Sequence, residues 1–155
     1  MEVVGSGRGA SPASVQSRKD ITTIPSTVEA ALQAYKMANL SPKDIDFVEV
    51  HDCFTIAELI DIEDLGFYPK GSAAQAVREG RTRLNSDITV NPSGGLKSKG
   101  HPIGATGVGQ VVEVFEQFTN KAGERTVKDA EIAMTHNFGA TGASAAVHIL
   151  SLIHI

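Results

Sequence analysis

Apolar residues recur at helical spacing in three stretches of the chain. The first follows Pro25, where Ser26 and Glu29 form the capping-box pattern that marks a helix start. One face of this predicted helix is apolar and comprises Val28, Ala31, Leu32, Tyr35 and Ala38. A second helix is expected to begin near Phe54 and to end at Gly66. Its inward-facing residues should be Ile56, Leu59, Ile60 and Leu65.

The clearest helical pattern begins at Ile103. Its apolar stripe is made of Val108, Val111, Val112, Phe115 and Phe118. Three glycines in its first turns would let another backbone approach closely, namely Gly104, Gly107 and Gly109. Ser41 and Asp44, with Pro42 at the first helical position, predict one short turn. Residues 72–78 predict a small surface helix.

Short runs between these helices predict strands. They cover residues 1–7, 47–50, 87–90, 131–135 and 143–150. The stretch 8–24 is rich in Ser, Gly and Thr and is typical of a loop. The Gly-containing turn 137–142 should join the last two strands into a hairpin. Strands that alternate with helices, followed by a hairpin, indicate an α/β layered domain.

Composition narrows the function classes. The 155 residues suffice for one domain with a real core, and the net charge of −4 comes without a basic run or stripe. We therefore expect no nucleic-acid surface. No apolar run approaches the roughly 20 residues that span a bilayer, so no membrane span is expected. The single cysteine, Cys53, excludes an intrachain disulfide and fits a reducing compartment.

Both ends of the chain look unusual. The strand predicted at residues 1–7 has no lead-in and needs neighbours on both sides, which favours a chain that starts inside a larger fold. Residues 151–155 resemble a non-native tail, and a slightly long edge strand explains them equally well.

The first candidate for chemistry is the tetrad His51-Asp52-Cys53-Phe54, where a strand ends and a helix begins. Polar residues at such a position can project into a cleft beyond the strand ends. A thiol beside a helix N-terminus is favoured as thiolate, so Cys53 could exchange a proton with a carbon acid. His51 should point to the same side as Cys53. A buried apolar cysteine beside a helix-capping Asp52 is the alternative interpretation.

The second candidate is the glycine-rich stretch 91–107 around His101. A neutral imidazole there could take a proton from a thiol and return it. Gly95 and Gly100 have the spacing of a nucleotide phosphate loop, but His101 and Pro102 stand where that motif needs Lys and Ser or Thr. A purely structural glycine loop with an incidental histidine is the other reading.

The third candidate is the hairpin turn 136–142, whose backbone N–H groups could point at a developing oxyanion. An ordinary tight turn would also explain it. A metal site is not expected, because the chain has no paired CxxC, HExxH or EF-hand pattern and His51-x-Cys53 alone is weak.

Taken in order, these motifs resemble the thiolases of the sterol-carrier-protein type and the archaeal acetoacetyl-CoA thiolases. The resemblance extends over residues 1–150 and is carried by three segments in this order: His51-Asp52-Cys53-Phe54, Asn91-Pro92-Ser93-Gly94-Gly95, and the segment from Gly100-His101-Pro102 to Gly107. It implies one βαβαβαββ half of the α-β-α-β-α layered thiolase fold. The chain would be the C-terminal thiolase domain, with the N-terminal half missing.

The resemblance also implies an activity. Enzymes of this family cleave 3-ketoacyl-CoA with coenzyme A, or condense two acyl-CoA molecules, through a nucleophilic cysteine in the first half. Coenzyme A and acyl-CoA thioesters would be substrates, with no covalently bound cofactor. The partners would be a thiolase N-terminal half and, in the full-length enzyme, a second copy in a homodimer. The compartment would be cytoplasmic in a prokaryote and peroxisomal or mitochondrial in a eukaryote.

Residue roles carry over by position. His101 would activate the missing nucleophile, Cys53 would move the proton on the substrate α-carbon, and His51 would help hold the enolate oxygen. Asn137 stands where related enzymes have a second catalytic cysteine, and Gly139 would offer its N–H to the acyl oxyanion. The expected substrate-binding residues are Phe54, Gly94, Gly95 and Gly100.

One departure and two alternatives remain. Ala140-Thr141-Gly142 follows Gly139 where the family usually has Gly or a small apolar pair, which puts the shape of that oxyanion hole in doubt. A catalytically silent thiolase-like subunit or scaffold with a separate partner chain is the main alternative. A metal-binding module is a weaker one.

Overall fold

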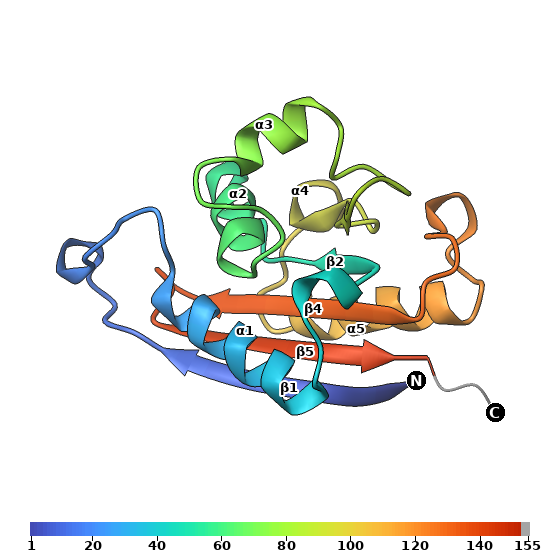
Figure 1. Cartoon of the computed structure of the whole chain (residues 1–155), viewed down its shortest axis with the longest axis horizontal. Coiled ribbons are helices and arrows are strands. Elements are labelled where there is room, and N and C mark those ends of the chain that lie inside the picture. The colour runs from blue at the N-terminus through green and yellow to red at the C-terminus, as the bar shows by residue number, and fades with distance from the viewer. Residues whose placement is uncertain (153–155) are drawn as a thin grey trace.

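A five-stranded mixed sheet organises the chain, whose computed structural model describes residues 1–152 (Figure 1). The strand order is β1-β5-β4-β2-β3. The strands are β1 (Glu2–Ala10), β2 (Phe47–Glu49), β3 (Thr89–Val90), β4 (Ile132–Gly139) and β5 (Ser144–Ser151). β2 runs parallel to β3 and β4, whereas β4 and β5 form the predicted antiparallel hairpin and β1 pairs antiparallel with β5.

Helices cover both faces of this sheet. On one face, α1 (Pro25–Ala38) lies across β1 and β5, and α2 (Thr55–Asp64) and α3 (Ala73–Arg78) continue the layer (Figure 1). On the other face, α5 (Thr106–Phe118) packs on β4. The short helix α4 (Gly95–Lys99) lies before α5, and single 3-10 turns occupy Val15–Ser17, Pro42–Asp44 and Gly123–Arg125. The element order is the βαβαβαββ predicted above.

Alternating side chains of the strands point to opposite faces of the sheet and pack into two separate hydrophobic cores. Met134 of β4 points into the larger core beneath α1 and α2, together with Ile62 and Ile149. Its neighbour Ala133 points into the smaller core beneath α5, with Phe47 and Val114. Apolar residues therefore occur at consecutive positions of β4, because both of its faces are buried there.

The first strand is longer than predicted, and residues 8–10 are strand rather than loop. The pairing of β1 with β5 continues to Ala10 opposite Ser144. Glycines let this strand lie directly under α1, since a Cβ at Gly7 would be 1.9 Å from the Ala30 carbonyl oxygen. A Ser- and Gly-rich stretch therefore serves here as a closely packed strand.

The predicted capping box at Ser26 and Glu29 is wrong. Ile24 occupies the N-cap of α1, and neither polar side chain caps the helix. Ser26 donates to the carbonyl of Gly142 at 2.7 Å, and Glu29 accepts from the backbone N–H of Ala10 at 3.2 Å. Both side chains therefore form hydrogen bonds with residues distant in sequence instead of capping the helix. The second cap is confirmed, because Ser41 and Asp44 form a complete capping box.

The inward faces of the first two helices are only partly as predicted. Leu32 of α1 and Ile56 of α2 are 65% and 60% exposed, so both predictions were wrong. Leu65 is buried, and Gly66 ends the helical segment with a φ of +90°. Small residues such as Ala30 and Ala34 form the buried face of α1, because that helix lies close to β1.

Most of the apolar stripe of α5 faces away from the core. Val108 and Val112 are 66% and 49% exposed, and only Phe118 of the stripe is fully buried. The buried side carries Gln110, Glu113, Val114 and Gln117. The glycines expected to admit another backbone meet little of it, because nothing in the described chain lies within 4 Å of a Cβ built at Gly104 or Gly109.

The C-terminal residues are ordered as far as they are described. Ser151 belongs to β5, and the backbone N–H of Leu152 donates to the carbonyl of Glu131 at 2.8 Å. The rest of the suggested tail, 153–155, lies outside the described residues. Among residues 1–152, none of the helices has the length and apolar character that crossing a bilayer requires.

Candidate active site

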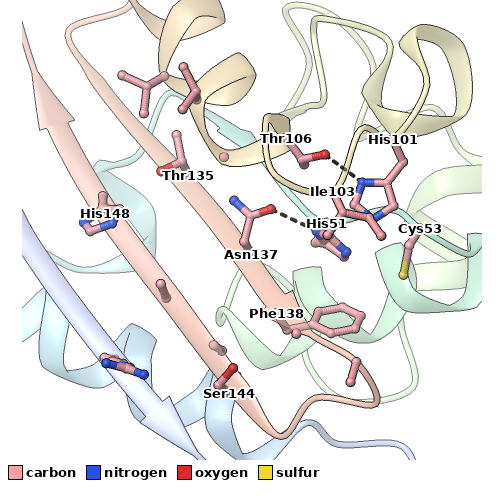
Figure 2. A pocket seen from close by; sticks show the side chains of 18 of the residues that line it. His51, Cys53, His101, Ile103, Thr106, Thr135, Asn137, Phe138, Ser144 and His148 are labelled. Atoms are coloured by element: carbon pink, nitrogen blue, oxygen red, sulfur yellow. Dashed lines mark hydrogen bonds between the residues drawn. The ribbon is translucent and has the colours of Figure 1, made fainter.

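A cavity of about 990 Å³ lies between α5 and the face of the sheet formed by β4 and β5. It collects most of the residues singled out from the sequence, as Figure 2 shows. Those lining it are His51, Cys53, Phe54, His101, Asn137 and Gly139. The three candidate motifs, far apart along the chain, therefore form one site.

Strand register brings His51 to Asn137. In the parallel pair of β2 and β4, Glu49 lies opposite Thr135, and His51 and Asn137 each follow two residues later. The Nδ1 atom of His51 lies 2.9 Å from Oδ1 of Asn137, the contact dashed in Figure 2. Burial, followed by the neighbouring His101, lowers the pKa of His51 below its ordinary value of 6.5. Its imidazole is therefore neutral at pH 7.

His101 precedes α5 and is held by the first turn of that helix. Its Nδ1 lies 2.6 Å from the hydroxyl of Thr106, which itself donates to the Pro102 carbonyl at 3.3 Å. A hydroxyl can donate one hydrogen bond and accept another, so Thr106 can accept from the Nδ1–H of His101 while it donates to Pro102. With Nδ1 engaged by Thr106, Nε2 is the ring nitrogen left to act as a general base. The rings of His101 and His51 meet edge to face at 4.9 Å.

The expectation that Cys53 is favoured as thiolate is not met. Burial raises the pKa of its thiol above the ordinary value, and the carboxyl groups of Asp61 and Asp52 add to this rise. Backbone N–H groups at the start of α2 act in the opposite direction but are the smaller influence. In this chain the thiol, which can donate a proton, is the favoured form.

Asp52 holds the glycine-rich loop against the tetrad. Its buried carboxylate accepts hydrogen bonds from the backbone N–H groups of Leu96 at 2.7 Å and Lys97 at 3.3 Å. It thereby caps α4 rather than the helix that follows it in sequence. A Cβ at Gly95 would lie 2.3 Å from Oδ2 of Asp52, which explains the glycine.

The other glycines predicted to bind substrate also have conformational reasons. Gly94 and Gly100 flank α4 with φ of +89° and +84°. Neither they nor Gly95 line the cavity, so the structure does not bring them to the site. Phe54 does line it, 68% exposed, with Nζ of Lys97 5.7 Å from its ring.

A second buried carboxylate fixes the same loop. Glu49, at the end of β2, accepts from the backbone N–H of Ser93 at 3.0 Å and from its hydroxyl at 2.7 Å. Lys99 reaches the same carboxylate at 3.2 Å. Burial raises the pKa of Glu49 despite these partners. Together, the side chains of Glu49 and Asp52 hold the loop that precedes His101 against the end of β2, which His51 follows.

The turn after β4 keeps the unusual Thr141 out of the cavity. Its hydroxyl donates to the backbone carbonyl of Ala13, on a different loop. Ala140, with φ of +54°, makes the turn, and Gly139 lines the cavity. The hydroxyl that departs from the family pattern therefore does not narrow the site.

Sequence reasoning missed Thr106 and Gln110, which contact the predicted residues His101 and Asn137, and Glu49, which holds the loop before His101. Gln110 is fully buried in α5, and its amide nitrogen donates to the His136 carbonyl at 3.1 Å. The side-chain amide of Asn137 donates to Oε1 of Gln110. A polar residue on the face of α5 opposite the apolar stripe was the available signal.

No group of three or more possible metal ligands forms within residues 1–152.

Comparison with known proteins bears on this geometry. The sequence model of the thiolase C-terminal domain-like family matches residues 7–152. The acetyl-CoA acetyltransferase of Methanothermobacter thermautotrophicus is 54% identical over 149 residues, which cover 96% of this chain and 39% of that protein. Human sterol carrier protein 2 is 46% identical over 115 residues, covering 74% of this chain and 21% of that protein.

A solved structure shows the same fold. The Ltp2-ChsH2(DUF35) aldolase superposes with a TM-score of 0.82 at 21% identity, over 97% of this chain and 39% of the other. The chain thus spans about two fifths of the length of this structure and of its archaeal relative. The matched family, the shared fold and the single cavity that unites the motifs establish that this chain belongs to the thiolase family, as a thiolase C-terminal domain.

Proposed function

We propose that this chain supplies the acid/base and oxyanion-binding groups of an acyl-CoA C-acyltransferase, acting on a nucleophilic cysteine from a thiolase N-terminal half. The observation that carries the proposal is the meeting of His101, His51 and Cys53 in one cavity, with Nδ1 of His101 bound to Thr106 so that Nε2 is the nitrogen left for proton transfer. A base, an acid and a polar wall are what thioester exchange and α-proton transfer need.

The chemistry divides between the two ends of the site. In thiolysis, the incoming nucleophilic cysteine would lose its proton to Nε2 of His101 and attack the 3-keto carbonyl. The bond between the carbonyl carbon and the α-carbon breaks, and its electron pair becomes the enolate of the departing acyl-CoA. The Cys53 thiol then gives its proton to that α-carbon. The raised pKa of Cys53 suits this donation.

The remaining residues would bind charge and substrate. His51, which lines the cavity, would bind the enolate oxygen, and Gly139 would present its N–H to the acyl oxyanion. Phe54, exposed at the rim, would contact the acyl or pantetheine chain. Coenzyme A thioesters would be the substrates, with no covalently bound cofactor, and the full-length enzyme would be a homodimer.

The partner half has a surface to occupy. The outer side of α5 exposes Val112 and Phe115, and the exposed Val108 and Ile103 continue this apolar surface to the cavity that they line. Gly104 and Gly109 leave room for another backbone on the same side. Contiguous exposed apolar surface of this kind is typical of an interaction site. The greater length of the archaeal relative supports a further half as its occupant.

Complementation tests the proposal. The chain is mixed with a separately produced thiolase N-terminal half, and thiolysis of acetoacetyl-CoA is followed. We expect activity only in the mixture, and a loss of about 10³-fold or more with His101→Ala, since nucleophile activation disappears.

A second variant separates the two steps. Cys53→Ser should stop α-proton exchange with solvent while the N-terminal half is still acylated, because serine is too weak an acid to take over. A stable complex without thiolysis would contradict the proposal and favour a catalytically silent subunit.

A further inference from the structure

A chain of hydrogen bonds connects the backbone carbonyl of His136 to His51 through the side chains of Gln110 and Asn137. The carbonyl determines which group is the donor in each of these bonds. The His136 carbonyl can only accept, so Gln110 must present its amide nitrogen there, at 3.1 Å. Its Oε1 then faces Asn137 and can only accept from the Asn137 amide nitrogen. Gln110 is completely buried, so no solvent is available to satisfy a reversed amide.

The direction of these hydrogen bonds also determines which ring nitrogen of His51 carries a proton. With its nitrogen turned to Gln110, Asn137 presents Oδ1 to His51, 2.9 Å from Nδ1. An amide oxygen has no proton, so Nδ1 of His51 must carry one. In the neutral imidazole that leaves Nε2 unprotonated. Nε2 has no hydrogen-bond partner within the described residues, and His51 lines the cavity.

We infer that Gln110 is a positioning residue that acts through Asn137 to hold neutral His51 in its Nδ1–H tautomer, so that Nε2 offers a lone pair to the site. The network also accepts the imidazolium, in which both nitrogens are donors. It excludes only the neutral Nε2–H tautomer. His51 can therefore donate to an enolate oxygen only as the imidazolium, after Nε2 has taken a proton from the solvent that reaches the cavity.

This refines the role of His51 within the proposed function and rests on it. A neutral Nε2–H group would polarise a thioester oxygen before any proton has moved. The arrangement seen here instead links the donor to a positive charge, which interacts more strongly with an enolate than a neutral donor does. The enolate oxygen would then be bound by a charged hydrogen-bond donor.

The tautomer can be measured on this chain alone, without substrate or partner. Long-range ¹H–¹⁵N correlation spectra of the ¹⁵N-labelled chain near pH 8 distinguish protonated from unprotonated ring nitrogens. We expect Nδ1 of His51 to be protonated and Nε2 unprotonated. A predominant Nε2–H form would overturn the inference even in the wild-type chain.

Two substitutions then test Gln110 itself. Gln110→Met has similar bulk but cannot fix the Asn137 amide, so the Nε2–H form should rise to a substantial share. Gln110→Glu keeps an acceptor for Asn137 and should retain the Nδ1–H form. An unchanged tautomer in a folded Gln110→Met chain would contradict the role of Gln110. Because none of these readouts is catalytic, failure here would leave the acyltransferase proposal standing, and failed complementation would leave the tautomer result intact.

Discussion

At the scale of single residues, two buried titratable groups outside the cavity have strongly shifted pKa values. Asp61 and His136 are both fully buried, with Oδ2 and Nδ1 3.7 Å apart. Neither carboxylate oxygen of Asp61 nor Nδ1 of His136 has a hydrogen-bond partner in the described chain. Burial lowers the pKa of His136 to about 3, and burial together with Asp64 raises that of Asp61 well above its ordinary value. Burial therefore favours the neutral form of both groups.

These two shifts have opposite consequences for stability. For His136 the unfolded chain binds more protons between pH 6.5 and about 3, so its contribution is lost as pH falls below 6.5. For Asp61 the folded chain binds more protons, so stability is lost as pH rises above 3.8, its ordinary value. Asp61→Asn should therefore raise the free energy of unfolding by about 1–3 kcal/mol near neutral pH, because an amide does not titrate and avoids the penalty for keeping a buried carboxyl protonated.

Urea unfolding of the two chains at pH 5 and pH 8 measures this difference. The gain should be larger at pH 8, where the penalty for keeping Asp61 protonated is greater. Asp129→Asn, at an exposed residue, is the control and should change nothing. A gain that is equal at both pH values would argue against a titrating Asp61.

Asp52 supports a second prediction at this scale. Asp52→Ala leaves the backbone N–H groups of Leu96 and Lys97 without their carboxylate, which should cost about 2–3 kcal/mol of unfolding free energy. Hydrogen exchange of these two amides should accelerate more than that of the core strands. Asp52→Asn, which keeps one acceptor, should lie between wild type and alanine. Equal protection in all three chains would show that the loop is held by other contacts.

At the scale of elements, glycine decides how closely β1 and α1 pack. Gly7→Ala would put a Cβ 1.9 Å from the Ala30 carbonyl oxygen, so the helix must move. We expect a loss of about 3 kcal/mol, at the upper end of typical overpacking costs. Thermal or urea unfolding measures it.

Gly109→Ala is the matched control. It lies within α5 with nothing inside 4 Å of the added Cβ. It should stabilise the isolated chain by about 0.5–1 kcal/mol, since alanine favours helix. If Gly7→Ala were equally harmless, the close contact of β1 with α1 could not be present in solution.

Elements also show where sequence patterns succeed. The order of helices and strands, the hairpin and the Ser41–Asp44 cap follow from periodicity and turn residues, which act locally. The Ser26–Glu29 cap and residues 8–10 were mistaken, because distant partners there override local preference. The direction of the α5 stripe was also undecidable locally, since the helix is amphipathic but its polar side is the one packed on the sheet.

At the scale of the whole molecule, the outer side of α5 should behave as an interface. Val112→Lys should leave the fold of the isolated chain unchanged, because Val112 is 49% exposed. It should weaken the complex with a thiolase N-terminal half by at least about 100-fold, the cost of burying an unpaired charge. Titration calorimetry or sedimentation measures the affinity. Leu32→Lys, on exposed α1, is the control and should bind normally.

The sequence by itself determined the α/β class, the element order and the thiolase resemblance, because periodicity and short motifs are local properties. Of the nine site residues that the sequence predicted, six line the cavity. Only the tertiary structure decided that Gly94, Gly95 and Gly100 serve the backbone, that burial raises the pKa of Cys53, and that Gln110 stands behind Asn137. Burial, strand register and hydrogen-bond direction depend on residues distant in sequence, and these contacts exist only once the chain has folded.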